Sequence, residues 1–130
     1  MKSSLARIAE LRATLQRQAK VALALAEHDL AKAREAADAL AEHTVAEGLG
    51  GPVSASSLQL CESMGAVARA ATAMAQRERD ARAAVAATRT RETRQIEVLV
   101  ERLEQKARRD EATREQRDSD DRAQRRKVTP

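Results

Sequence analysis

The chain has 130 residues, the length of one domain, and it contains no Phe, Trp or Tyr. It therefore lacks the side chains that supply much of the buried area in compact cores and that stack on nucleic-acid bases. Charged residues make up 34% of the chain, 29 residues are Ala, and the net charge is +4, a composition typical of long helices rather than of a globule.

The first predicted element is a helix over about residues 4–47. Apolar residues recur from Ile8 to Leu40 at steps of three and four, which is the spacing of one face of a helix. Part of this series repeats every eleven residues, and such a repeat favours a nearly straight stripe over a strict leucine zipper.

A break in the helical pattern follows at residues 48–55. Three of the four glycines and one of the two prolines fall in the run from Gly48 to Pro52, and Gly followed by Pro stops a helix. Ser56 with Gln59 three residues later matches a capping box, which predicts the start of the next helix.

The second predicted helix covers about residues 56–126. Its apolar residues alternate at steps of four and three, with Glu78 and Glu92 at two positions of the same series, a mostly heptad pattern. The predicted coiled-coil seam of the two helices consists of Ile8, Leu11, Leu15, Leu30, Leu40, Leu60, Met64, Val67, Met74, Val85, Ile96, Leu99 and Leu103.

These elements predict an all-α fold, a single two-helix antiparallel coiled-coil hairpin spanning residues 1–130. A short connection makes neighbouring helices antiparallel. The first helix can then cover the second only to about residue 100, so we expect the last part of the longer helix to project at the C-terminus or to meet another protein. No apolar run reaches the ~18 residues of a membrane span, and no signal-peptide pattern precedes the first helix.

Few residues are candidates for catalysis or metal binding. Cys61 is the single cysteine, which excludes an internal disulfide and fits a reducing, cytoplasmic compartment. His28 and His43 lie fifteen residues apart, and a zinc site needs three or four convergent ligands. An Ala-rich hairpin also builds no pocket for a substrate. We expect no catalytic residue, no metal and no cofactor, and hence not an enzyme.

The segment from Glu101 to Lys127 is the most polar part of the chain, with 18 charged residues in 27. Its run Arg114-Glu115-Gln116-Arg117-Asp118-Ser119-Asp120-Asp121 resembles the Arg-Glu-Gln-Lys-x-x-Asp-Glu run near the C-terminus of the flagellar-export FliJ proteins and their injectisome counterparts, the YscO-type stalk proteins. Glu115, Gln116 and Asp120 match directly, whereas Arg117 and Asp121 are conservative replacements. The two-helix layout matches over the whole chain.

The resemblance implies a non-enzymatic stalk that docks in the pore of the hexameric export ATPase and promotes its assembly and turnover. It assigns the ATPase contact to Arg114, Glu115, Gln116, Arg117, Asp120 and Asp121. It further implies contacts with the cytoplasmic domain of the export-gate membrane protein and with export chaperones, and a place at the inner membrane through these partners only. The family carries aromatic residues along its hairpin, some of them tied to gate contact, and this chain has none, so no gate-binding position is transferred.

Two other functions fit the same residues. The hairpin leaves one face of each helix thinly covered, which favours a coiled-coil scaffold or oligomerisation module. Basic clusters at Arg108-Arg109 and Arg125-Arg126-Lys127 could neutralise phosphates. Residues 91–130 carry 12 basic and 10 acidic residues, a net of +2. A basic region that binds DNA is far more one-sided, so we expect no nucleic-acid partner.

Overall fold

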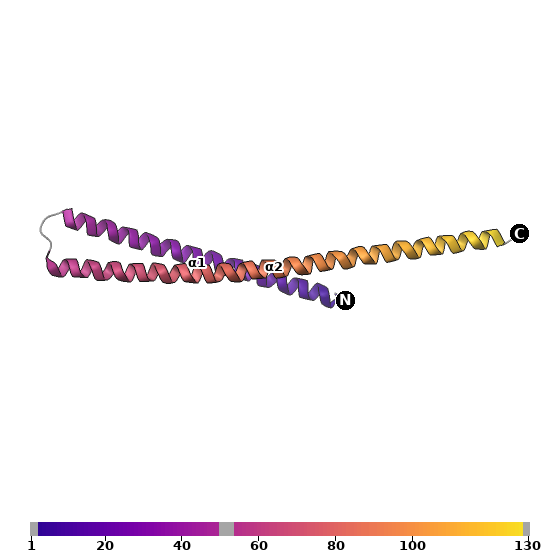
Figure 1. Ribbon diagram of the computed structural model, residues 1–130, viewed down its shortest axis with the longest axis horizontal. Helices are drawn as coiled ribbons and strands as arrows, with labels where there is room; N and C mark the ends of the chain where they lie inside the picture. The colour runs from indigo at the N-terminus through magenta and orange to yellow at the C-terminus, as the bar shows by residue number, and fades with distance from the viewer. Residues whose placement is uncertain (1–2, 50–53, 129–130) are drawn as a thin grey trace. The chain divides into compact units, whose positions relative to one another are not determined.

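The computed structural model describes residues 3–49 and 54–128, which form an all-α helical hairpin (Figure 1). Helix α1 comprises Ser4–Leu49, 46 residues, and helix α2 comprises Ala55–Val128, 74 residues. The two helices include every described residue except Ser3 and Ser54. Each predicted helix end lies within two residues of the observed one. The predicted turn residues at 50–53 lie outside the described residues.

Both helices begin with a serine cap. The Ser3 hydroxyl accepts a hydrogen bond from the backbone N–H of Ala6 at 3.2 Å, and the Ser54 hydroxyl accepts one from the backbone N–H of Ser57 at 3.2 Å. Each bond satisfies an N–H group that has no partner within the helix. The capping box predicted at Ser56 is wrong, because Ser54 caps the helix two residues earlier and Ser56 already lies inside α2.

The chain divides into two units, of which unit 2 comprises residues 14–90. Hydrogen bonds show that its helix segments are antiparallel. Gln16 Nε2 donates to Thr90 Oγ1 at 3.3 Å and Arg34 Nη2 to Gln76 Oε1 at 2.8 Å. Near the other end of the segment, Glu47 Oε2 accepts from Cys61 Sγ at 3.7 Å. As the residue number rises along α1, that of the α2 partner falls.

The interface of unit 2 is built from small side chains. The buried hydrophobic residues are Ala19, Ala26, Leu30 and Ala86, and Leu30 is the single large side chain among them, at 4% exposure. No described side chain is less than 2% exposed. Alanine lets helix backbones approach closely but removes little apolar surface from water. The hairpin therefore depends strongly on its few larger buried groups.

The inward-facing register of α2 differs by one residue from the predicted seam. The half-buried positions near the start of α2 are Cys61, Gly65, Ala68 and Thr72. The predicted seam residues Leu60, Met64, Val67 and Met74 are 47–70% exposed, and Val85 is 46% exposed, whereas Ala86 beside it is buried. Thr72 Oγ1 lies 3.5 Å from the backbone carbonyl of Ala33 on α1, so the small residues of this series face α1 and the larger side chains lie to one side.

The predicted seam is closer to the observed one on α1. Leu30 is buried, and Leu15 and Leu40 are half-buried. Ile8 and Leu11 are 42% and 59% exposed. On the later part of α2, Ile96 is half-buried, while Leu99 and Leu103 are 44% and 48% exposed.

Unit 1 comprises residues 1–13 together with 91–130, and polar groups link its two helix segments. The Arg12 guanidinium forms an ion pair with the Glu92 carboxylate. The Thr93 hydroxyl, in a residue only 5% exposed, donates to the Arg12 backbone carbonyl at 3.3 Å. Glu92 occupies a position of the predicted apolar series, and the ion pair gives this carboxylate a partner on α1.

Gly65→Ala is expected to raise the melting temperature by a few degrees. Gly65 lies inside α2, where Ala is favoured over Gly by about 1 kcal/mol. A Cβ there would meet Arg69 Nη1 at 3.2 Å, the far end of a flexible side chain that can move aside. Thermal unfolding followed by circular dichroism measures the change. A lower melting temperature would show that Arg69 cannot yield.

Candidate functional site

The clearest surface for a partner is the end of α2 in unit 1. Every described residue from Glu101 to Val128 is exposed, and we call residues 101–128 the C-terminal arm. Because the arm buries no side chain against the rest of the described chain, tertiary packing does not explain its charged sequence.

Local interactions account for the helical conformation of the arm. Glu104 and Arg108 pair at 3.9 Å over one helical turn, and Thr113 Oγ1 donates to the Arg109 carbonyl at 2.9 Å. The last turn carries Arg125, Arg126 and Lys127, and positive charge there opposes the negative end of the helix dipole. Such exposed pairs stabilise a helix by only about 0.2–0.5 kcal/mol each.

The six predicted docking residues lie on more than one side of the arm. Arg114, Arg117 and Asp121 are spaced by three and four residues and so share one face. Gln116 and Asp120 share another face, where Gln116 Nε2 donates to Asp120 Oδ1 at 3.1 Å. At about 100° per residue, Glu115 points away from both groups. The structure thus brings these residues together along the arm but distributes them around its circumference.

A second polar cluster lies between the last turns of α1 and the first turns of α2. Glu47 Oε1 contacts His43 Nε2 at 3.0 Å, and Glu47 Oε2 accepts from the thiol of Cys61 at 3.7 Å. His43 and Cys61 thus contact the same carboxylate, that of Glu47. The described residues contain no group of three or more His, Cys, Asp or Glu side chains that could hold a metal ion.

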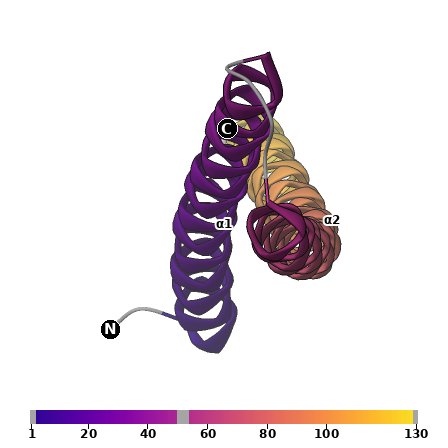
Figure 2. The ribbon, with the colours of Figure 1, turned by 90° about the vertical axis from the view of Figure 1, so that its left-hand side faces the viewer.

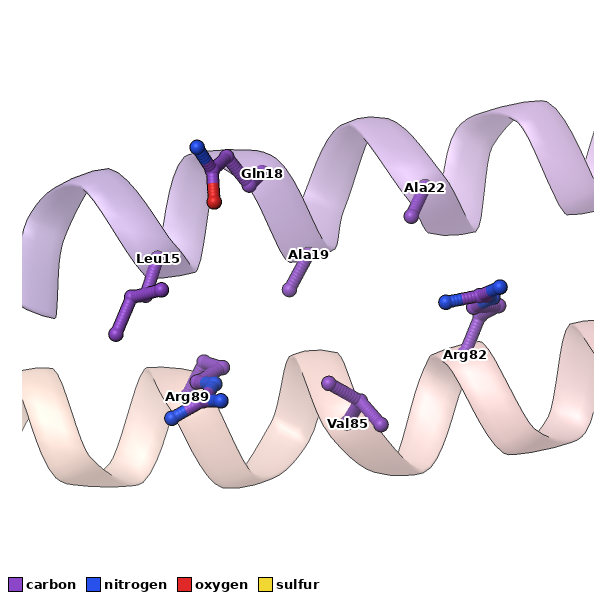
Figure 3. Close-up of a pocket in the computed structure, with 7 residues that line it drawn as sticks. All are labelled: Leu15, Gln18, Ala19, Ala22, Arg82, Val85 and Arg89. Carbon is purple, nitrogen blue, oxygen red and sulfur yellow. The ribbon is translucent and has the colours of Figure 1, made fainter.

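Shallow grooves run beside the interface of unit 2. One has a volume of about 260 Å³ and lies between α1 and α2, where Leu15, Ala19 and Ala22 point toward α2 and Val85 lines the groove from α2 (Figure 3). Arg82 and Arg89 line it from α2. Arg82 is engaged, since its Nε donates to Glu78 Oε1 at 2.8 Å. The long aliphatic stems of such arginines cover apolar surface while their charged ends stay in water.

Two further grooves flank the row of half-buried α2 residues at 61, 65, 68 and 72. The larger, about 590 Å³, includes Val45, Leu58, Cys61 and Glu62 in its wall, and the smaller, about 440 Å³, includes Met64 and Val67. Leu40 and Ala68 border both. We call the first the Cys61 groove and the second the Met64 groove. Seen from this end of unit 2, α1 and α2 lie side by side and no other described helix covers them (Figure 2).

Sequence reasoning missed both grooves and the role of Glu47. The signal was present in the spacing of Cys61, Gly65, Ala68 and Thr72, a second series at steps of four and three beside the predicted one. Small residues at heptad spacing permit close packing of helices, and that series marks the true interface. The larger side chains of the neighbouring series led to the prediction of that series as the interface instead.

Models of known protein families, curated proteins and solved structures include no match to this chain. Among the described residues, no helix combines the length and apolar character that a membrane span requires.

Proposed function

We propose that the chain is a stalk or accessory coiled coil of a flagellar or type III protein-export apparatus. Its C-terminal arm docks in the ring of the hexameric export ATPase and promotes assembly and activity of that ring. The observation that carries the proposal is the arm itself, 28 residues of charged helix with every side chain exposed. The resemblance of residues 114–121 to the FliJ and YscO-type proteins supports the identity of the partner.

The distribution of the arm's charges supports docking within a ring. A helix that binds a flat surface presents one face, whereas a helix enclosed by a ring meets protein on all sides. Arg114, Gln116 and Glu115 point in three different directions around the arm. Contacts between exposed charges in water contribute only about 1 kcal/mol at 4 Å, so such a shaft is not trapped strongly in one orientation.

The same resemblance extends the proposal to two further partners. These are the cytoplasmic domain of the export-gate membrane protein and the export chaperones, and they would hold the chain at the inner membrane without inserting it. The hairpin of unit 2 is available for these contacts because its Cys61 groove is open to solvent.

Addition of the intact chain to the purified export ATPase is expected to raise both ATP hydrolysis and the fraction of hexamer. A chain that lacks residues 108–130 is expected to do neither. The truncated chain should keep its hairpin melting temperature, because the removed residues that the structure describes are all exposed. Hydrolysis assays, sedimentation of the ATPase and circular dichroism of the truncated chain measure the three quantities.

Charge reversal tests whether stimulation of the ATPase depends on the motif at residues 114–121 or only on the overall charge of the arm. Glu115→Lys with Asp121→Lys changes two proposed contact residues, and Glu101→Lys with Glu104→Lys makes the same net change in the same arm outside the motif. We expect the first variant to lose stimulation and the second to keep most of it. Full stimulation by the truncated chain would show that the arm does not dock.

A further inference from the structure

An exposed apolar stripe runs along α2 in unit 2. Leu60, Met64, Val67, Met74 and Val85 are 61%, 47%, 70%, 68% and 46% exposed. Together with Ala71 and Ala81, which are also exposed, they occupy heptad positions, and we call these seven residues the α2 stripe. Water-soluble monomers rarely expose a contiguous apolar surface of this extent without a binding partner.

Helix α1 does not cover the α2 stripe. The residues of α2 that face α1 follow the stripe by one position, at Cys61, Gly65, Ala68 and Thr72. At about 100° per residue, the stripe therefore points sideways from the interface. The Met64 groove adjoins it and adds Ala36 and Leu40 of α1 to the same apolar surface.

The surface around the first half of the stripe, from Leu60 to Met74, carries little charge. Between Leu58 and Gln76 the only charged residues are Glu62 and Arg69, and both line the Cys61 groove on the other side of the helix. Within the stripe's heptad series the single charged member is Glu78, whose carboxylate is paired with Arg82 at 2.8 Å. A polyanion or a strongly charged protein surface would find few complementary groups beside Leu60 to Met74, whereas Arg77, Arg79, Asp80 and Arg82 accompany the second half of the stripe.

We propose that the α2 stripe binds the α2 stripe of a second copy of this chain. Heptad spacing is complementary to another helix with the same spacing, and a two-fold dimer brings the same patch of both copies together. From Leu60 to Val85 the stripe is about 38 Å long, and the face that it forms with the α1 residues of the Met64 groove is at most two helices, or about 20 Å, wide. The footprint is therefore at most on the order of 800 Å² per subunit, the area that each subunit of a stable dimer buries.

Antiparallel pairing of the two stripes fits their side chains. A parallel pair in register would place Glu78 beside Glu78 of the second copy, and like charges repel. In an antiparallel pair with Leu60 opposite Val85, Met64 lies opposite Ala81 and Ala71 lies opposite Met74. The large side chains then meet small or medium ones, and Val67 packs on the aliphatic part of Glu78.

This dimer goes beyond the proposed function and does not depend on it. The stripe ends at Val85, whereas the C-terminal arm begins at Glu101, so the two surfaces share no residue. Self-association and docking of the arm can accordingly be abolished one at a time.

Sedimentation equilibrium under reducing conditions tests the proposal. The intact chain is expected to have twice the monomer mass at high concentration. Val67→Glu with Met74→Glu should weaken the dimer by a hundredfold or more, on the order expected when charges must be buried without partners. Val45→Glu with Leu58→Glu is the matched control, because these side chains are 62% and 50% exposed in the wall of the Cys61 groove.

Circular dichroism shows whether each variant remains helical, as expected for changes at exposed positions. Disulfide cross-linking shows the direction in which the two stripes pair. It uses two variants, Leu60→Cys and Val85→Cys, each made in a chain that also carries Cys61→Ser. Antiparallel pairing yields a disulfide-linked dimer only when the two variants are mixed and oxidised. A monomer at every concentration, equal dissociation of the control, or a linked dimer of Leu60→Cys alone would each overturn the proposal.

Discussion

Leu30→Ala is expected to destabilise the hairpin by about 2–4 kcal/mol, the cost of removing a buried leucine side chain. Leu30 is 4% exposed and is the only large hydrophobic side chain among the described residues that is buried. The other buried hydrophobic residues of the described chain are alanines, so no larger buried side chain compensates for the loss. For a small domain this loss corresponds to a fall in melting temperature of roughly 10 °C or more.

Leu25→Ala provides the comparison, because it is the same change on the same helix. Leu25 is 60% exposed, so its truncation removes little buried surface, and Ala is slightly the better helix former. Thermal melts at one fixed protein concentration compare the two variants, since self-association would make stability depend on concentration. Equal melting temperatures would mean that the helices of unit 2 do not pack through Leu30.

The helices could be predicted closely from the sequence, and the reason is local. The glycine- and proline-rich run that begins at Gly48 predicts the end of one helix, and a run of serines from Ser54 predicts the start of the next. Between these points Ala and charged residues favour helix almost everywhere. Prediction of the cap failed by two residues because three serines in the segment 54–57 can each accept the capping hydrogen bond, and only the folded geometry selects Ser54.

The packing register of α2 could not be predicted from the sequence. Two heptad series run side by side, one of large residues through Leu60, Met64 and Val67, and one of small residues through Cys61, Gly65 and Ala68. Ranking by hydrophobicity selects the first, since burial of larger side chains removes more apolar surface from water. Close approach of the two backbones selects the second. Without an aromatic anchor in the chain, no single residue decides between them.

The exposure of the candidate docking segment could be predicted from the sequence. The unequal helix lengths and the charge density after Glu101 predict an arm with no intramolecular partner, and all its described residues are exposed. The arrangement of Arg114, Gln116 and Glu115 around the arm follows from helical geometry once the helix is known to continue to Val128. The identity of the partner rests on the family resemblance and on the ATPase experiment.

Ala26→Leu is expected to destabilise the hairpin by about 1–3 kcal/mol, although it makes the chain more hydrophobic. Ala26 is 6% exposed in the interface where small side chains allow α1 and α2 to approach. A leucine there must either adopt a strained conformation or push the helices apart, which would remove Ala19 and Ala86 from contact. Thermal unfolding of unit 2, followed by circular dichroism, measures the loss.

Ala24→Leu separates this packing effect from a change in helix propensity. Ala24 is two residues from Ala26 and lies on the exposed side of α1. Because Leu is nearly as good a helix former as Ala, the free energy of unfolding of this variant should be within a few tenths of a kcal/mol of that of the parent chain. If Ala26→Leu were instead stabilising, the interface would hold unfilled space and the helices would not be in close contact. Destabilisation at residue 26 alone would show that small size, and not hydrophobicity, selects the residues at this interface.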